Sequence, residues 1–252
     1  MRPIMRTAVF ALLALLLALP THAQSPDDTP WTIDHVLRQR SLDDVDIGPD
    51  GTRVLWVKET PDPEADETQR DLYLTYRDDP HGGDSTATIR LTRTGNNRDP
   101  RWSPNGHQIA FLSSRDTDEE DESSGTQIWR LDPRGGAPEA VTATEHGVQG
   151  ARWLDDDSIL FTAREKSTRY EDHLEETEDD ARVVEDTTLY RPVRLFVVNV
   201  ETEEVTRLTE NEGQIEEFVP SPDGRYVVYS RSDSPIDADA RNQPHQYLLD
   251  LQ

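Results

Sequence analysis

Apolar runs broken by short polar turns recur along this chain. Three segments align, and each contains an extended stretch, a four-residue turn ending in glycine, and a run of β-branched and aromatic residues: 45–57, 101–112 and 218–229. This pattern predicts one β-hairpin per segment. A fourth segment, 152–161, keeps the flanks but has three aspartates at 155–157 in place of the turn. We expect one aspartate to take the left-handed conformation that glycine takes in the other copies.

The turns themselves have a recognisable chemistry. In residues 103–106 and 221–224, proline fixes φ at the second position, Asn or Asp suits the third, and glycine takes the left-handed position that follows. A type I turn followed by such a glycine gives a short hairpin with a bulge. The predicted structural turn residues are Pro49, Gly51, Pro104, Gly106, Pro222 and Gly224.

Two shorter apolar runs follow each of the first three hairpins, including the one at 152–161, and the second run ends in threonine. These pairs of runs are 72–74 with 89–92, 128–131 with 140–142, and 195–200 with 205–209. Each unit therefore predicts four antiparallel strands. Units of this kind, repeated every 50 to 70 residues or so, are typical of propeller blades, here lengthened by loops such as 116–125 and 164–189.

The predicted fold is accordingly all-β, a partial β-propeller of about four four-stranded blades with TolB/WD40-like repeats. The blades are expected at about 41–92, 98–142, 148–209 and 215–252. The last blade has only three predicted strands, so we expect an unclosed ring and a chain that is a fragment. A complete four-bladed propeller is the alternative, and it predicts cooperative unfolding of the isolated chain.

The first 40 residues have a different pattern. Arg2 and Arg6 precede an apolar run at 8–19, and small residues follow up to Ala23, as in a secretory signal peptide. Cleavage after Ala23 would remove residues 1–23 and send the protein to a secreted or periplasmic location. An uncleaved membrane anchor is the alternative. In the remaining N-terminal segment, 24–40, the apolar spacing predicts a short helix at 31–40.

Composition excludes several classes of function. The 252 residues hold 51 Asp and Glu against 26 Lys and Arg, a formal net charge of −25, so nucleic acid and anionic membranes are not expected partners. Without cysteine there is no disulfide, thiolate metal site or cysteine nucleophile. Because only Lys58 and Lys166 are lysines, a halophilic source is a further hypothesis.

Three stretches together resemble a known family. They are residues 31–57 (WTIDHVLRQRSLDDVDIGPDGTRVLWV), the second blade from RWSPNGHQIAFLSSR at 101–115, and the region after Val184 that leads into the last hairpin. In this order they resemble the N-terminal propeller of prolyl oligopeptidase family serine peptidases, in the dipeptidyl aminopeptidase and acylaminoacyl-peptidase group. TolB-like propellers share the Ser-Pro-Asp-Gly hairpin. A TolB-like interaction module with a protein partner is therefore the alternative.

The resemblance implies that the propeller and a separate catalytic domain have different roles. In the family, an α/β-hydrolase domain with a Ser, Asp and His triad follows the propeller, and the propeller admits peptides while excluding folded proteins. This chain has no G-x-S-x-G motif, and the nearest string, Gly83 to Ala87, lacks the second glycine. We therefore expect no catalytic residue here. The parent protein would be a serine-type peptidase that meets its peptide through a C-terminal hydrolase domain absent from this chain.

Acidic residues are the remaining candidates for binding. In dipeptidyl peptidases of the family a propeller glutamate pair holds the substrate's amino terminus, which suggests Glu175 and Glu176 here. Glu185 with Asp186 is a weaker alternative. The simplest alternative is that these acids form a solvated surface and bind nothing. The acidic loops lack EF-hand spacing and the histidines are scattered, so no metal or cofactor is predicted. The tryptophans and phenylalanines of the strands are expected to pack between blades.

Overall fold

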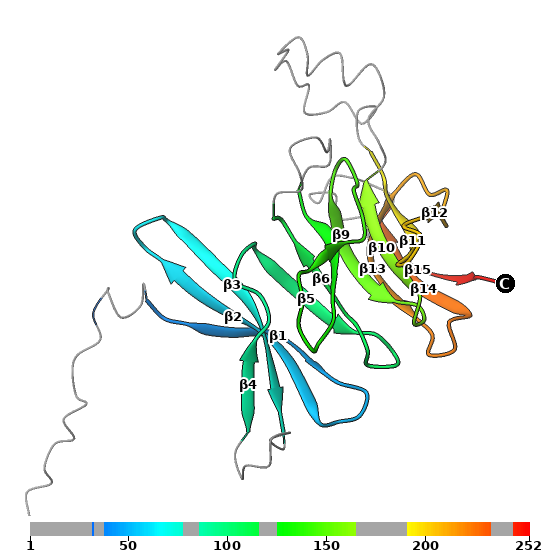
Figure 1. The fold of residues 1–252 in the computed structure, drawn as a ribbon. Coiled ribbons are helices and arrows are strands. Elements are labelled where there is room, and N and C mark those ends of the chain that lie inside the picture. The colour runs from blue at the N-terminus through cyan, green and yellow to red at the C-terminus, as the bar shows by residue number, and fades with distance from the viewer. Residues whose placement is uncertain (1–31, 33–37, 78–85, 116–124, 165–190, 233–243) are drawn as a thin grey trace, which may run out of the picture. The chain divides into compact units, whose positions relative to one another are not determined.

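The computed structural model describes residues 32, 38–77, 86–115, 125–164, 191–232 and 244–252. The chain divides into two units, Met1–Arg38 and Gln39–Gln252, and all fifteen described strands lie in the second (Figure 1). The described residues contain no α-helix, and among them no helix is long and apolar enough to cross a membrane. The predicted signal peptide and most of the predicted helix at 31–40 lie outside them.

The strands form four antiparallel sheets in chain order, which confirms the all-β prediction and the incomplete fourth unit. The first sheet contains β1 (Ser41–Ile47), β2 (Arg53–Asp62), β3 (Glu67–Tyr76) and β4 (Ala87–Arg90). The second contains β5 (Asn97–Trp102), β6 (Ile109–Ser113), β7 (Gln127–Leu131) and β8 (Glu139–Ala140). The third contains β9 (Val148–Trp153), β10 (Ser158–Arg164), β11 (Val193–Asn199) and β12 (Val205–Arg207). The fourth contains β13 (Gln214–Pro220), β14 (Tyr226–Ser232) and β15 (His245–Asp250).

The cores lie between neighbouring sheets. Leu55 and Leu72 of the first sheet share one buried cluster with Phe111 of the second. The opposite face of the second sheet packs against the third, and the third against the fourth. Strand β6 is buried along its whole length because both of its faces are covered. The aromatic residues Trp102, Trp129, Trp153 and Phe161 pack between sheets, as expected.

The three glycine-containing turns have the same geometry. Gly51, Gly106 and Gly224 have φ of 67°, 69° and 68°, in the left-handed region. Their backbone nitrogens donate to the carbonyl three residues earlier at 2.8, 2.8 and 2.9 Å. The expectation for 155–157 was wrong: none of the three aspartates has a positive φ. This hairpin is one residue shorter, closed by Leu154 N and Ser158 O at 2.9 Å, so no left-handed residue is required.

The turns of successive sheets lie next to one another. A Cβ added to Gly106 would lie 3.3 Å from Pro49 Cδ of the preceding turn. Asn105 N donates to Asp156 Oδ1 at 2.8 Å, which joins the second turn to the third. A Cβ on Gly224 would lie 3.4 Å from Leu154 O, at the third turn. One end of the sheets is thus a continuous row of hairpin turns.

A buried threonine repeats two residues after the fourth strand of each complete sheet. Its hydroxyl accepts a hydrogen bond from a backbone nitrogen of the third strand, so it replaces a carbonyl in the ladder. The three pairs are Thr92 with Leu72 at 2.9 Å, Thr142 with Ile128 at 2.9 Å, and Thr209 with Leu195 at 3.0 Å.

Candidate functional site

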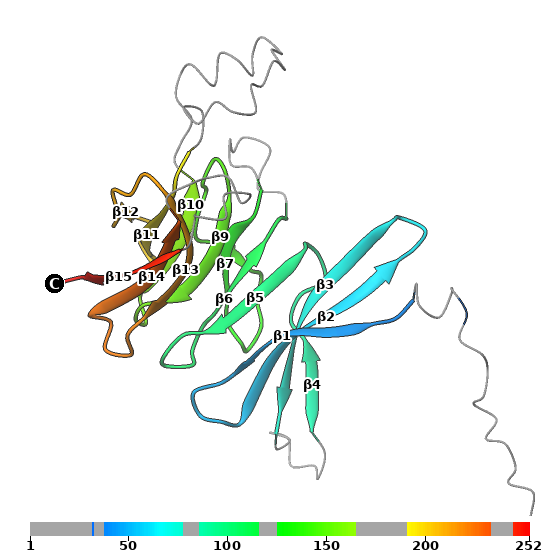
Figure 2. The ribbon, with the colours of Figure 1, turned by 180° about the vertical axis from the view of Figure 1, so that it is seen from behind.

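The first strands of neighbouring sheets come together. Strand β1 contacts β5, β5 contacts β9, and β9 contacts β13, in the order seen from behind in Figure 2. Every substantial contact between neighbouring sheets includes the first strand of the later sheet. In a propeller the first strands line the central channel, so their side chains are the first candidates for contact with a ligand.

A carboxylate sits at a bulge in each of the first two of these strands. Asp44 and Asp99 have φ of 46° and 49°, and both lie where the strand register shifts. Asp44 Oδ2 accepts a hydrogen bond from Asp99 N at 2.8 Å. Asp46 Oδ2 accepts another from Trp102 N at 2.8 Å. The two β1 carboxylates therefore supply acceptors to backbone N–H groups of the next sheet.

Residues of the second sheet join it to the third sheet in a similar way. Asp99 pairs with Arg101 of its own strand at 2.5 Å and with Arg152 of β9 at 2.6 Å. Trp153 Nε1 donates to Arg101 O at 3.1 Å. These charges are engaged in joining sheets, so the exposed acids Asp43 on β1 and Glu216 and Glu217 on β13 are left as the anionic groups of the first strands.

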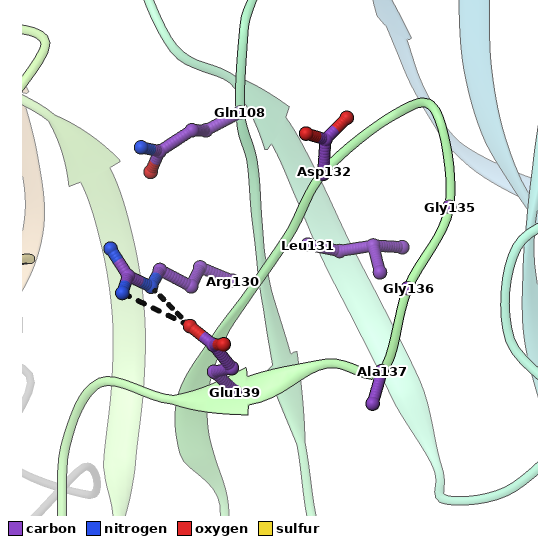
Figure 3. A pocket seen from close by; sticks show the side chains of 8 residues that line it. All are labelled: Gln108, Arg130, Leu131, Asp132, Gly135, Gly136, Ala137 and Glu139. Carbon is purple, nitrogen blue, oxygen red and sulfur yellow. Dashed lines mark hydrogen bonds and ion pairs between the residues drawn. The ribbon is translucent and has the colours of Figure 1, made fainter.

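A cavity of about 410 Å³ lies beside the second sheet (Figure 3). Arg130 is part of its lining and pairs with Glu139 at 3.0 Å and with Glu201, in the turn between β11 and β12, at 2.6 Å. Burial alone would lower the pKa of Arg130, but these two carboxylates raise it above its ordinary value. Gln108 Oε1 is buried without a hydrogen-bond partner. The cavity can hold polar groups, and the described residues that line it include no serine, threonine, histidine or lysine; they are Gln108, Arg130, Leu131, Asp132, Gly135, Gly136, Ala137 and Glu139.

The structure does not describe the predicted binding residues. Glu175, Glu176, Glu185 and Asp186 lie outside the described residues, as does the segment 83–85. Within the described part of the chain, no group of three or more His, Asp or Glu residues could hold a metal ion. The aspartates at 155–157 form a hairpin turn instead. Sequence reasoning missed Asp44, Asp99 and Arg152, whose only signal is that charged residues recur just before each hairpin.

Comparisons with known proteins connect this fold to peptidases. The chain is 28% identical over 239 residues to the uncharacterized peptidase YuxL of Bacillus subtilis strain 168, which covers 86% of the chain and 33% of YuxL. The chain thus spans about a third of the length of this curated relative. No family model matches the sequence.

Solved structures give the fold. Acylaminoacyl peptidase of Pyrococcus horikoshii matches with a TM-score of 0.58 and 17% identity, over 86% of this chain and 32% of that one. The β-propeller domain of the trilobed protease of Pyrococcus furiosus matches with 0.50 and 14%, over 84% and 55%. TolB of Acinetobacter baumannii matches with 0.50 and 15%, over 83% and 41%.

The fold is therefore that of a propeller whose described sheets do not close into a ring. The sequence match to a peptidase, together with these structures, confirms the resemblance to the propeller region of prolyl oligopeptidase family peptidases.

Proposed function

We propose that this chain is the non-catalytic propeller portion of a secreted or periplasmic serine exopeptidase, and that it screens and positions peptides for a hydrolase domain. The observation that carries the proposal is the match of 86% of the chain to one third of a peptidase. A propeller of that relative length leaves room for a catalytic domain. The absence of G-x-S-x-G from the sequence is consistent with a separate site of chemistry.

The first strands suggest how positioning would work. Asp44, Asp46 and Asp99 fix the spacing of neighbouring sheets. The exposed carboxylates of Asp43, Glu216 and Glu217 add to a strongly negative field, which attracts the ammonium group of a peptide's amino terminus. Glu175 and Glu176 remain proposed ligands of that ammonium group, as the family resemblance implies. Secretion is proposed from the signal-like residues 1–23.

The test compares two proteins. One is the purified 252-residue chain, and the other is the product of the gene's full reading frame, read past codon 252. We expect no peptide hydrolysis by the first, and cleavage of short peptides, but not of the same sequence inside a folded protein, by the second. Replacing the serine of a downstream G-x-S-x-G motif by alanine should abolish the cleavage. A stop codon directly after Gln252, or hydrolysis by the short chain that one of its own serines controls, would refute the proposal.

A TolB-like interaction module is the second candidate, supported by the structural match to TolB. It predicts a reading frame without a hydrolase domain and a stable complex with a protein partner. Co-purification of a stoichiometric partner with a chain that lacks any downstream catalytic motif would favour this function over the peptidase.

A further inference from the structure

Among the described residues Arg115 has no carboxylate partner, in a chain that has about twice as many acidic as basic residues. It follows β6 directly and is partly buried. Other arginines of the described strands, such as Arg70 and Arg90, are paired with acids at 2.5 and 2.6 Å. In the part of the chain that the structure describes, Arg115 contacts only neutral acceptors and aromatic rings.

These neutral contacts hold the guanidinium in place. Its Nε donates to Ser113 Oγ at 3.2 Å, and Nη2 donates to Thr94 O at 3.2 Å and to Asn97 Oδ1 at 2.7 Å. The Cζ atom lies 4.8 Å from the ring centroid of Trp129. Stacking on one face and hydrogen bonds on two edges leave the guanidinium little freedom to turn.

The groups that hold Arg115 are themselves fixed. Asn97 is fully buried, and its Nδ2 donates to Arg70 O at 2.8 Å and to Thr92 Oγ1 at 3.1 Å. Gly95 has φ of 83°, and a Cβ there would lie 2.7 Å from Ser113 Oγ and 3.1 Å from Arg115 Nε. The guanidinium therefore lies close to a backbone position that favours glycine, and an added side chain at Gly95 would collide with Ser113 and Arg115.

The remaining hydrogen-bonding capacity of Arg115 is specific. A guanidinium carries five N–H groups, of which three are directed at the neutral acceptors above. The two N–H groups of Nη1 have no acceptor in the described residues. Burial lowers the pKa of Arg115, and none of the described carboxylates offsets this effect. A partly desolvated guanidinium with a fixed plane, and with N–H groups that no described residue accepts, suits the planar oxygens of a carboxylate.

We propose that Arg115 is a binding site for a carboxylate of a peptide ligand, either its free C-terminus or an Asp or Glu side chain. The site lies at the end of the sheets opposite the row of hairpin turns, because Arg115 follows the end of β6 and its partner Thr94 lies between β4 and β5. It stands independently of whether the chain serves a peptidase. The net charge of −25 opposes anion binding at long range, but salt near 0.15 M screens charges more than about 8 Å away and leaves the direct contact.

The experiment measures binding of three acetylated peptide probes to the purified 252-residue chain by calorimetry at fixed ionic strength. The probes are an all-alanine tetrapeptide with a free C-terminus, its C-terminal amide, and the amide with one internal aspartate. We expect the free acid, the aspartyl amide or both to bind at least about tenfold more tightly than the plain amide, as expected for a charge-assisted contact. Which of the two binds identifies the source of the carboxylate.

Two variants and a control complete the test. Arg115→Met keeps the apolar stem over Trp129, and it should abolish the difference between acid and amide. Arg115→Lys keeps the charge but loses the planar fork, and it should retain part of the difference. Arg53→Met is the matched control, because Arg53 stacks over Trp102 at 4.4 Å but is already paired with Asp50 at 3.0 Å.

Thermal unfolding of each variant separates a lost site from a lost fold. Unchanged unfolding of Arg115→Met with lost discrimination supports the proposal, and if this variant unfolds early, the result for Arg115→Lys decides. Equal affinity of the wild-type chain for acid and amide probes, absence of binding by any probe, or an equal loss in Arg53→Met would overturn it.

Discussion

The carboxylate of Asp99 lies 2.6 Å from the guanidinium of Arg152, so an ion pair joins the first strand of the second sheet to the first strand of the third. Asp99 also pairs with Arg101, and its own backbone nitrogen is bound by Asp44 of the first sheet. One residue at a strand bulge therefore connects three successive sheets. Such bulges place a side chain where regular strand geometry would not, and here they place it at the sheet junction.

Asp99→Asn tests this junction. Asparagine tolerates the left-handed backbone of this position, so the change removes the charge and little else. Because the side chain of Asp99 is only 18% exposed, we expect a loss of about 1–2 kcal/mol in the free energy of unfolding, measured by denaturant titration. Asp132→Asn, which breaks a pair confined to one loop with Arg134, should cost less than about 0.5 kcal/mol. Equal effects of the two changes would contradict the assignment.

The turn glycines allow a second test of contact between sheets. Gly51 and Gly106 have nearly the same φ, but a Cβ on Gly51 meets nothing within 4 Å. A Cβ on Gly106 would lie 2.9 Å from Arg53 Nη2 and 3.3 Å from Pro49 Cδ. Both alanine variants should lose about 1–2 kcal/mol of stability, because alanine is strained in the left-handed backbone conformation. We expect Gly106→Ala to lose about 1 kcal/mol more, because the neighbouring turn must shift. Thermal unfolding of both variants measures the difference, and a larger loss for Gly51→Ala would refute the contact.

These turns also show what could be predicted from the sequence. Proline and glycine determine local backbone angles, so the hairpins and the order of the four sheets follow from a short pattern. The turn at 155–157 was mispredicted because the closing pair of residues, Leu154 and Ser158, depends on strand register. Register is decided by both strands together and cannot be read from the turn alone.

The contacts between sheets could not be predicted from the sequence for a different reason: they join residues that are far apart in the chain. The pair Arg130 and Glu201 spans 71 residues, and Asp44 meets the backbone of residue 99. The repeated threonines were seen only as strand ends, because their hydroxyl groups act on a strand some 14 to 20 residues away. Arg115 gave no signal, because its contacts with Asn97 and Trp129 exist only once the strands are assembled.

Glu59 should contribute to stability in a pH-dependent way. Its carboxylate accepts hydrogen bonds from Ser41 on β1 and from Arg70 on β3, and these contacts lower the pKa of Glu59 below its ordinary value. The folded chain thus binds the proton less readily than the unfolded chain. The stabilisation is present above about pH 4.5 and is lost as the pH falls through the lowered pKa of the folded state.

Glu59→Gln should therefore lower the free energy of unfolding near neutral pH, and its difference from the wild type should shrink on acidification. Urea titrations from pH 7 downward measure this difference. Glu204→Gln, an exposed residue without an ion pair in the described residues, is the control and should give a difference near zero at every pH. A Glu59→Gln difference that stays constant or grows toward acid pH would show that the carboxylate is not stabilised in the fold.

The outer face of the fourth sheet should make the isolated chain associate with itself. Val219, Val228 and Leu248 lie opposite one another across β13, β14 and β15, and they are 65%, 46% and 66% exposed. The other face of this sheet packs on the third sheet, where Val227 is fully buried. In a propeller both faces of a blade are covered, so this row of apolar side chains is suited to burial.

We expect light scattering to show a mass that rises with concentration for the wild-type chain and stays monomeric for Leu248→Ser. Val205→Ser, at an exposed valine of β12, should associate like the wild type. A wild-type chain that remains monomeric throughout the series, or an equal effect of Val205→Ser, would exclude this face as the contact.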